Sequence, residues 1–479
     1  MSISHALSNA LSGLTVNARR AEVGAANIAN AQTDGYGRRI VETGSASIGG
    51  SGAGVAVTGI TRSVNAVILG DRRASDGAMA AARQQSESLR AVEQAFGSVD
   101  DPGSLTARLV NLELALEAAA ADPASENRLR TGVRALGDLA AAIGQTARSV
   151  QTQRERADAD IAAAVDTLNR SLGQVDKLNT DIGRAIANGQ DPSGLMDQRQ
   201  VTIDRISVLV PVREVAQANG KVALWTMGGA QLLDGQPARI GFAPRTVITP
   251  DMTITTGALS GLTLDDEPLP SPVGRLTGGA LEAQFLLRDD TLLAQQAALD
   301  EIALDLVTRF SDPAVDRTLG PGAPGLLTDA GGAVTPGSEV GLAQRLRLNA
   351  SLDPAGANEV WRLRDGIGAT APGAIGDPTL IQSFQTALSD RRAIGTGYAL
   401  SAFDRIAQTS ERLSTERLAA EQELTFATAR RDSLRSTELS EGVDTDAELQ
   451  RLLVVEQAYA ANARVMQTID QMISRLMEI

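Results

Sequence analysis

Apolar residues at both ends of the chain recur at the spacing of helices that pair with another helix. Near the amino end the series is Ile3, Leu7, Ala10, Leu14, Asn17, Ala21, Gly24 and Ile28, with Leu11, Ala18 and Ala25 beside it. Near the carboxyl end it is Val455, Ala458, Asn462, Val465, Ile469, Met472, Leu476 and Ile479. Alternating steps of three and four keep side chains on one helix face. We therefore expect the terminal helices to pair with each other, or with neighbouring copies, while the interior loops out from this stalk.

The amino-terminal series runs into the segment "NIANAQTDGYGRR", residues 27–39. Asn30 is a residue type that often ends a helix, and Asp34-Gly35 favours a turn in which glycine supplies a positive φ. The chain is therefore predicted to leave the helix as extended backbone.

A glycine cluster follows in residues 47–54 and leads into the alternating apolar residues Val55, Val57 and Ile60. This pattern predicts a loop and then a half-buried strand. A phosphate-binding glycine loop is not indicated, because such a loop follows a strand and opens a helix, and the GxGxxG spacing is not met.

The spacing of apolar residues changes twice along the interior of the chain. Residues 76–210 have helical periodicity in several pieces, the longest at 146–188, and Pro211 closes the segment. From 212 to 277 short apolar runs alternate with turn signals, and Asn219-Gly220 predicts a β-hairpin. Helical patterns return at 279–310 and 380–437, whereas the Gly- and Pro-rich stretch between them allows no assignment.

These patterns predict a mainly α protein with an inserted β domain: an elongated, multi-domain chain with a helical-bundle body and terminal helices paired as a coiled-coil stalk. The predicted units are an amino-terminal helix and extended segment at 1–60, a helical body at 61–210, a small β domain at 211–277, continued helical body at 278–310, a Gly/Pro-rich outer region at 311–379, a last part of the body at 380–441, and a carboxyl-terminal helix at 442–479 that completes the unit begun by 1–60.

Composition and net charge argue against several classes of binding partner. The net charge of -14 argues against nucleic acid or an anionic membrane surface, because both require clustered Lys and Arg. No apolar run of about 18 residues suggests membrane insertion, and the amino terminus has no readable Sec signal. Aromatic residues make up 3% of the chain and hydrophobic residues 43%, a difference due largely to alanine, which suits closely packed helices.

Candidate catalytic chemistry is sparse. The sequence has no cysteine and one histidine, His5, which is expected to be a solvated helix residue. Carboxylates are plentiful, so a glycosidase that uses a pair of carboxylates stays open as an alternative. However, the acidic residues of the 146–188 helix are expected on its solvated face: Asp158, Asp160, Asp166 and Asp181. Arg38-Arg39 and Arg72-Arg73 are expected to be surface charges or inter-subunit contacts. We expect a non-enzymatic protein without cofactor or metal.

Both ends of the chain resemble one family. The amino-terminal "ALSGLTVNARRAEVGAANIANAQTDGYGRR" is similar to the signature of bacterial flagellar rod, hook and hook-associated proteins, and "ELQRLLVVEQAYAANARVMQTIDQMISRL" resembles their matching carboxyl-terminal motif. In the interior, "GLMDQRQ", "GAGVAVTGITR" and "EGVDTDAEL" resemble the hook-associated members. The pattern departs at Gly37, where serine is usual, at Arg39, where glutamine is usual, and at Gln200, which replaces an aspartate.

The resemblance implies a structural subunit that polymerises in a helical array on the distal end of the hook, at the hook–filament junction. It implies the hook protein, a second hook-associated junction protein, an export chaperone and the type III export apparatus as partners, and an extracellular location. It also assigns self-assembly contacts to the two ends: Ile3, Leu7, Leu11, Leu14, Asn27, Ile28, Asn30, Gly35, Tyr36, Leu452, Val455, Tyr459, Val465, Ile469, Met472 and Leu476.

Three alternatives stay open from the sequence. Hook protein or another rod or hook subunit would share the terminal motifs, but its body is expected to be mainly β. A glycosidase would act on a cell-wall glycan. An unrelated secreted coiled-coil binding protein would fail to assemble on hook protein.

Overall fold

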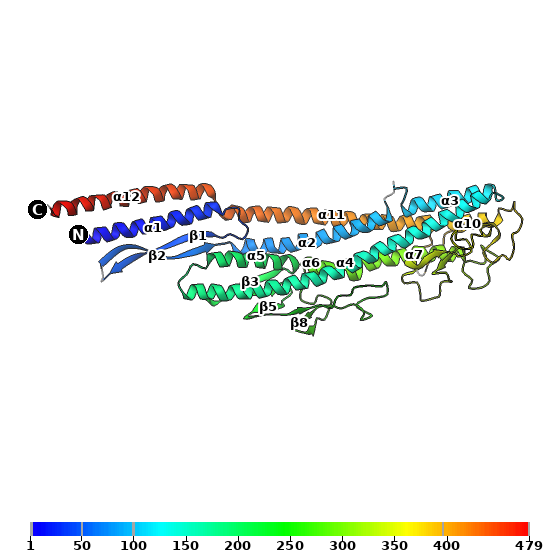
Figure 1. Cartoon of the computed structure of the whole chain (residues 1–479), viewed down its shortest axis with the longest axis horizontal. Helices are drawn as coiled ribbons and strands as arrows, with labels where there is room; N and C mark the ends of the chain where they lie inside the picture. The colour runs from blue at the N-terminus through cyan, green and yellow to red at the C-terminus, as the bar shows by residue number, and fades with distance from the viewer. Residues whose placement is uncertain (1–2, 49–50, 98–100, 395–396, 478–479) are drawn as a thin grey trace.

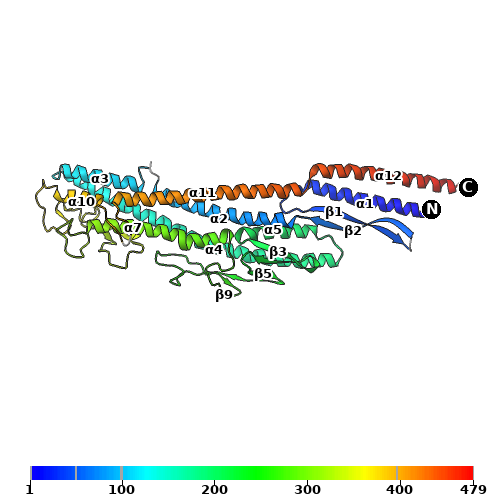
Figure 2. The ribbon, with the colours of Figure 1, turned by 180° about the vertical axis from the view of Figure 1, so that it is seen from behind.

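The computed structural model describes residues 3–48, 51–97, 101–394 and 397–477, and shows a long rod with both chain ends near one tip (Figures 1 and 2). Helix α1 (Ile3–Ala29) lies alongside α12 (Thr445–Met477) at this tip. The mainly helical, elongated fold with paired terminal helices is therefore confirmed.

A long antiparallel hairpin covers α1 on another side. It consists of β1 (Arg38–Ile48) and β2 (Ser51–Ser63), with Arg38 opposite Ser63 and a register irregularity between Glu42 and Thr43. The expectation of a loop at the glycine cluster is wrong for its described part, because Gly52 and Gly54 belong to β2. Gly54 has φ 92°, and a Cβ there would lie 2.0 Å from the Ser12 hydroxyl oxygen of α1. Only glycine allows the strand to approach the helix this closely.

The body is a bundle of long helices: α2 (Ala66–Phe96), α3 (Leu105–Ala121), α4 (Glu126–Ala187), α5 (Ser193–Leu209), α6 (Gly279–Leu286), α7 (Leu292–Phe310), α10 (Thr379–Ser389) and α11 (Ala402–Glu441). A π-helical turn (Leu287–Thr291) joins α6 to α7. Helix α4 begins earlier than the expected 146–188, because its apolar stripe continues upstream through buried Leu129, Val133 and Ile143.

Residues 212–268 form small sheets beside α4. Their strands are β3 (Val212–Ala216), β4 (Val222–Thr226), β5 (Gln231–Asp234), β6 (Gln236–Pro237), β7 (Ile240–Gly241), β8 (Thr263–Leu264) and β9 (Glu267–Pro268). The hairpin expected at Asn219-Gly220 is confirmed: both residues have positive φ, 58° and 70°, and join the antiparallel strands β3 and β4.

The Gly- and Pro-rich region 311–379 forms the outer tip of the rod (Figure 1). It contains short elements between loops: β10 (Leu327–Asp329), α8 (Leu342–Arg345), β11 (Leu346–Leu348) and α9 (Arg362–Asp365). The helix expected over 380–437 is wrong as one element, since α10 ends at Ser389 and α11 begins only at Ala402. The division into domains stays a prediction.

Several charges expected on the surface are buried. Asp158 is 1% exposed and pairs with Arg288 at 2.6 Å, so its placement on a solvated face was wrong. Arg72 and Arg73 are likewise buried and share the carboxylate of Asp204, at 2.7 Å each. Periodicity placed Asp158 on a polar helix face, but the β region covers it there, and the Arg245 amide donates to its carboxylate. Arg72 and Arg73 are covered by α5 instead, which supplies Asp204.

Candidate functional site

Asn27 holds the chain where it leaves the terminal helix. Its side chain is 1% exposed and donates to the carbonyl of Arg39 at 2.9 Å, while its oxygen accepts the amide of Arg39 at 3.0 Å. The same oxygen accepts the Tyr36 hydroxyl at 2.9 Å. Asn27 thus pairs with the first residues of β1 as a neighbouring strand would, which fixes the returning chain against α1.

The turn between α1 and β1 uses the remaining residues expected there. The Asn30 side chain donates to the carbonyl of Ala26 at 2.9 Å and closes the helix end. Gly35 has φ 75°, and a Cβ there would lie 2.5 Å from a methyl group of Val201 in α5, so the turn touches the body. Burial raises the pKa of the Tyr36 hydroxyl, which keeps it a neutral donor. Ile28 follows the buried Asn27 at the helix end and is half-buried.

Asp197 of α5 ties this turn and both hairpin strands to the body. Its carboxylate accepts the amide of Gly37 at 3.0 Å and pairs with Arg39 at 3.2 Å and Arg62 at 2.7 Å. Arg62 also donates to the side chain of Gln200. A Cβ at position 37 would lie 2.3 Å from the Arg62 Nε, so the side chain of Arg62 requires glycine there.

Of the three departures from the family pattern, Gly37 and Arg39 therefore contact Asp197 directly, and Gln200 joins the same cluster through Arg62. We call Asp197, Arg39, Arg62 and Gln200 the joint. Sequence reasoning missed it, because Asp197 and Arg62 are distant in the chain. The signal available was that the segment with Gly37 and Arg39 and the distant segment with Asp197 and Gln200 both depart from the family pattern.

Replacing Asn27 with alanine is expected to loosen the turn without disturbing the body. The change leaves the Arg39 amide and carbonyl buried without partners, at a cost of about 1–3 kcal/mol per unsatisfied group. We expect the Arg39 amide to exchange hydrogen about 10- to 100-fold faster, since about 1.4 kcal/mol corresponds to tenfold. Amide exchange of the purified chain measures this. Thr33→Val, which removes an exposed bond at 3.3 Å, is the control; equal exchange in both variants would contradict the role of Asn27.

The α1–α12 seam is built on small residues. A Cβ on Gly13 would lie 2.8 Å from the Asn462 amide nitrogen, and one on Gly24 3.1 Å from a methyl group of Leu452. The two helices therefore approach closely along this line. Ala10, Asn17 and Gly24 of the expected seam are buried.

The expected contact residues separate into inward and outward sets. Ile469 is buried, and the side chains that are half-buried are Ile3, Leu7, Leu14, Leu452 and Val455. Val465 and Met472 face outward within one chain, at 45% and 47% exposed, so their expected contact with neighbouring copies stays a prediction. Leu11 and Tyr459 are also outward, at 56% and 48%. The side chain of Leu476 lies outside the described residues.

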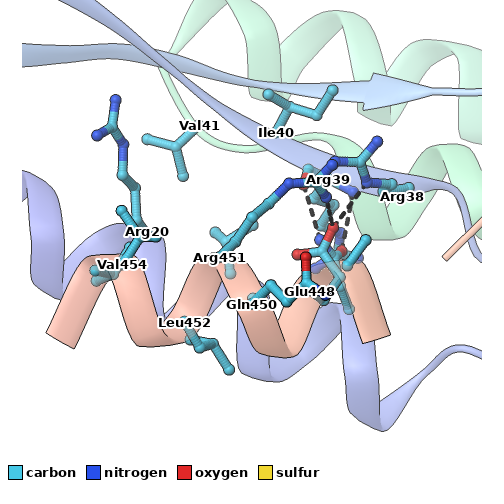
Figure 3. A pocket seen from close by; sticks show the side chains of 15 residues that line it. Arg20, Arg38, Arg39, Ile40, Val41, Glu448, Gln450, Arg451, Leu452 and Val454 are labelled. Atoms are coloured by element: carbon cyan, nitrogen blue, oxygen red, sulfur yellow. Dashed lines mark hydrogen bonds and ion pairs between the residues drawn. The ribbon is translucent and has the colours of Figure 1, made fainter. Parts of the chain in front are cut away.

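A groove lies between α1, β1 and the start of α12 (Figure 3). Its volume is about 570 Å³, and we call it the basic groove; it is lined by Arg20, Val23, Gly24, Asn27, Arg38, Arg39, Ile40, Val41, Ala447, Glu448, Gln450, Arg451, Leu452, Val454 and Val455. Glu448 is 5% exposed in its side chain and accepts Arg38 at 2.8 Å, and Arg451 from its own helix. The lining thus holds more guanidinium groups than carboxylates.

Metal sites and membrane-spanning helices are two further kinds of functional feature. Within 3–48, 51–97, 101–394 and 397–477, no cluster of His, Asp and Glu has the arrangement of a metal site. Over the same part of the chain, no helix is both long and apolar enough to span a bilayer.

Comparisons with known proteins concern the body and the carboxyl end. Residues 89–314 match the family model of the flagellar hook-associated protein FlgK helical domain, and 440–479 match that of the flagellar basal body rod FlgEFG protein C-terminal segment. Flagellar hook-associated protein 1 of Escherichia coli (strain K12) is 25% identical over 328 residues, covering 64% of this chain and 57% of that protein. That of Bacillus subtilis (strain 168) is 22% identical over 487 residues, covering 94% and 93%.

A solved structure of the flagellar hook junction protein FlgK from Burkholderia pseudomallei overlaps with a TM-score of 0.44 and 21% identity, covering 54% of this chain and 46% of that one. The chain therefore spans little more than half of the Escherichia coli relative and nearly all of the Bacillus subtilis relative.

Proposed function

We propose that this chain is a structural subunit of the hook–filament junction. The premise is that it belongs to the flagellar axial proteins, and among them to the hook-associated FlgK family. The observation that carries the proposal is the combination of a matched helical body, 89–314, with terminal helices that leave apolar side chains uncovered. Such faces become buried when copies pack side by side.

The terminal pair supports assembly through both of its helices. Helix α12 exposes Leu453 and Val454 at 59% and 65%, in addition to Tyr459, Val465 and Met472. In a helical array these side chains would contact neighbouring terminal helices. The hook protein below and a second hook-associated junction protein above would meet the two ends of that array.

Export is part of the same proposal. An exported subunit would leave the cytoplasm through the flagellar type III route, with a chaperone covering the apolar face of α12 until assembly. The subunit would then be extracellular and non-enzymatic. Asp158, one of the acids considered for a glycosidase, is engaged by Arg288 in the core, which supports a structural use of that carboxylate.

Hook protein is the second candidate, because it shares the terminal motifs. The long helices α2, α4 and α11 favour the junction subunit, since the body of hook protein is expected to be mainly β.

Imaging of antibody-labelled flagella tests the proposal. We expect one labelled band at the distal end of the hook, and no such band in cells that lack this chain. Label along the whole hook would indicate hook protein instead, and an absence of label from flagella would contradict both candidates.

A further inference from the structure

We propose that the basic groove of one copy receives an acidic segment of a second copy of this chain, namely Glu441, Asp444 and Asp446 between α11 and α12, which we call the acidic elbow. The inference rests on the proposed function, because it concerns copies within the same array, and it names the contact that joins them.

The groove carries an excess of positive charge in an acidic chain of net charge -14. Arg20, Arg38, Arg39 and Arg451 line it, Glu448 is the one carboxylate among its lining residues, and Asp197 of the joint pairs with Arg39. Arg20 is exposed, with a hydrogen bond of 3.2 Å to the Thr43 hydroxyl, and Arg451 is 53% exposed in its side chain. The Arg20 guanidinium is therefore accessible in the single chain, whereas that of Arg451 is paired with Glu448 but half-exposed. In Figure 3, Arg20 lies beside Val454 in the lining of the groove.

The acidic elbow carries exposed negative charge. All of its carboxylate residues are exposed, and Leu449 on the next turn is 51% exposed. Asp444 accepts the amides of Asp446 and Ala447 at 3.0 Å each, which caps α12 and holds the elbow in one shape. Asp446 projects from this cap, and no elbow residue lines the groove of its own chain.

Charge complementarity selects a second copy as the occupant. Strongly acidic subunits repel one another when they pack side by side, unless a basic surface of one faces an acidic surface of the next. Groove and elbow are different patches, so a copy can bind the elbow of one neighbour with its groove and offer its own elbow to another neighbour, which is a head-to-tail contact. A head-to-tail contact whose rotation does not close into a ring extends into a helical array.

Disulfide cross-linking tests the contact, because the chain contains no cysteine of its own. The variant carries Arg20→Cys and Asp446→Cys. Arg20 lies beside Val454, and eight helical residues span about 12 Å, whereas a disulfide requires Cα atoms within about 7 Å. A bond therefore forms between copies and not within one. We expect a ladder of multimers from oxidised flagella that a reductant collapses to monomer.

Matched controls make the cross-link interpretable. Arg83→Cys with Asp446→Cys places the first cysteine on an exposed arginine of the body, and should give monomer. Dimers without higher multimers would overturn the head-to-tail contact, since they indicate a symmetric one. Monomer alone from labelled, hook-attached chains would overturn the groove–elbow contact while leaving the proposed function intact. Absence of wild-type chain from the hook would overturn the proposed function itself.

Charge reversal provides an independent measurement. Arg20→Asp and Asp446→Arg should each reduce the number of labelled hooks about tenfold or more at equal secretion, and their combination should restore labelling to within about twofold of wild type, because the pair is again complementary. Normal labelling with either single change would overturn the proposal. A combined variant as poor as the single ones would do the same.

Discussion

A chain that ends before Thr445 is expected to fold its body and to fail in assembly. The described body contains two clusters of buried apolar side chains, and all of these residues lie between Leu89 and Ala420, so neither cluster includes a side chain of α1 or α12. Loss of α12 removes Leu452 from Gly24 and Glu448 from Arg38, and it uncovers the seam face of α1. We expect complete loss of labelled hooks and of swimming, with the thermal midpoint of the purified body within about 2 °C of the full chain, because about 1 kcal/mol shifts the midpoint of a 150–250-residue domain by about 2–4 °C and that of a larger one by less.

Measuring secretion distinguishes failed export from failed assembly as the cause of that loss. If the apolar face of α12 also binds the export chaperone, the truncated chain should accumulate in the cytoplasm and escape pull-down by the chaperone. Arg475→Ala, which changes one exposed side chain of α12, serves as the control and should assemble normally. Swimming restored by the truncated chain would show that α12 is dispensable, and undiminished chaperone binding would place the chaperone site elsewhere.

Arg288→Met is expected to destabilise the body by about 3–5 kcal/mol, because it leaves buried carboxylates without their cation. The guanidinium is 0% exposed in its side chain and pairs with Asp158 at 2.6 Å and Asp289 at 2.8 Å. It also donates to the carbonyl of Ser260 at 3.0 Å, and so links the π-helical turn to α4 and the β region. Burial already raises the pKa of Asp289, which indicates how unfavourable an unpaired charge would be there.

Urea unfolding followed by circular dichroism measures the change as a shift of the midpoint at unchanged slope. Arg83→Met is the matched control: its ion pair with Glu87 is 66% and 56% exposed, and exposed pairs contribute about 0–1 kcal/mol. Removing a carboxylate together with the cation, as Asp158→Leu with Arg288→Met, should recover part of the loss. Equal midpoints for Arg288→Met and Arg83→Met would contradict the account.

Local periodicity predicted two kinds of element. The first depends on residues that are close together in the sequence, and the second depends on apolar residues that repeat at a regular helical spacing. The Asn219-Gly220 hairpin is of the first kind and the terminal seam is of the second, since turn chemistry and side-chain spacing determine them. The outer tip could not be predicted, because its short strands β10 and β11 are stabilised by the core of α3, α4 and α7 and not by their own pattern.

The candidate site divides in the same way. Asn27 and Gly35 were predictable, because their roles depend on the turn that contains them. Asp197 was not, since its partner Arg62 lies 135 positions away and only the fold brings them together. The burial of Asp158 could not be predicted for a related reason: helical periodicity identifies a polar face, but not whether another element covers it.

The joint at Asp197 also determines how the rod responds to mechanical load. Its bonds to the turn, to β1 and to β2 act in parallel, so a force that bends the stalk away from the body is divided among them. The other connection, between α11 and α12, is the backbone of 442–444, beside the cap of Asp444 and the 2.7 Å hydrogen bond from Asn65 to Glu441. A torque on the stalk is therefore carried by two sets of bonds, the ion pairs of the joint on the hairpin side and the hydrogen bonds of the acidic elbow on the other. The bonds of the joint must break together before the stalk can bend away from the body on the hairpin side.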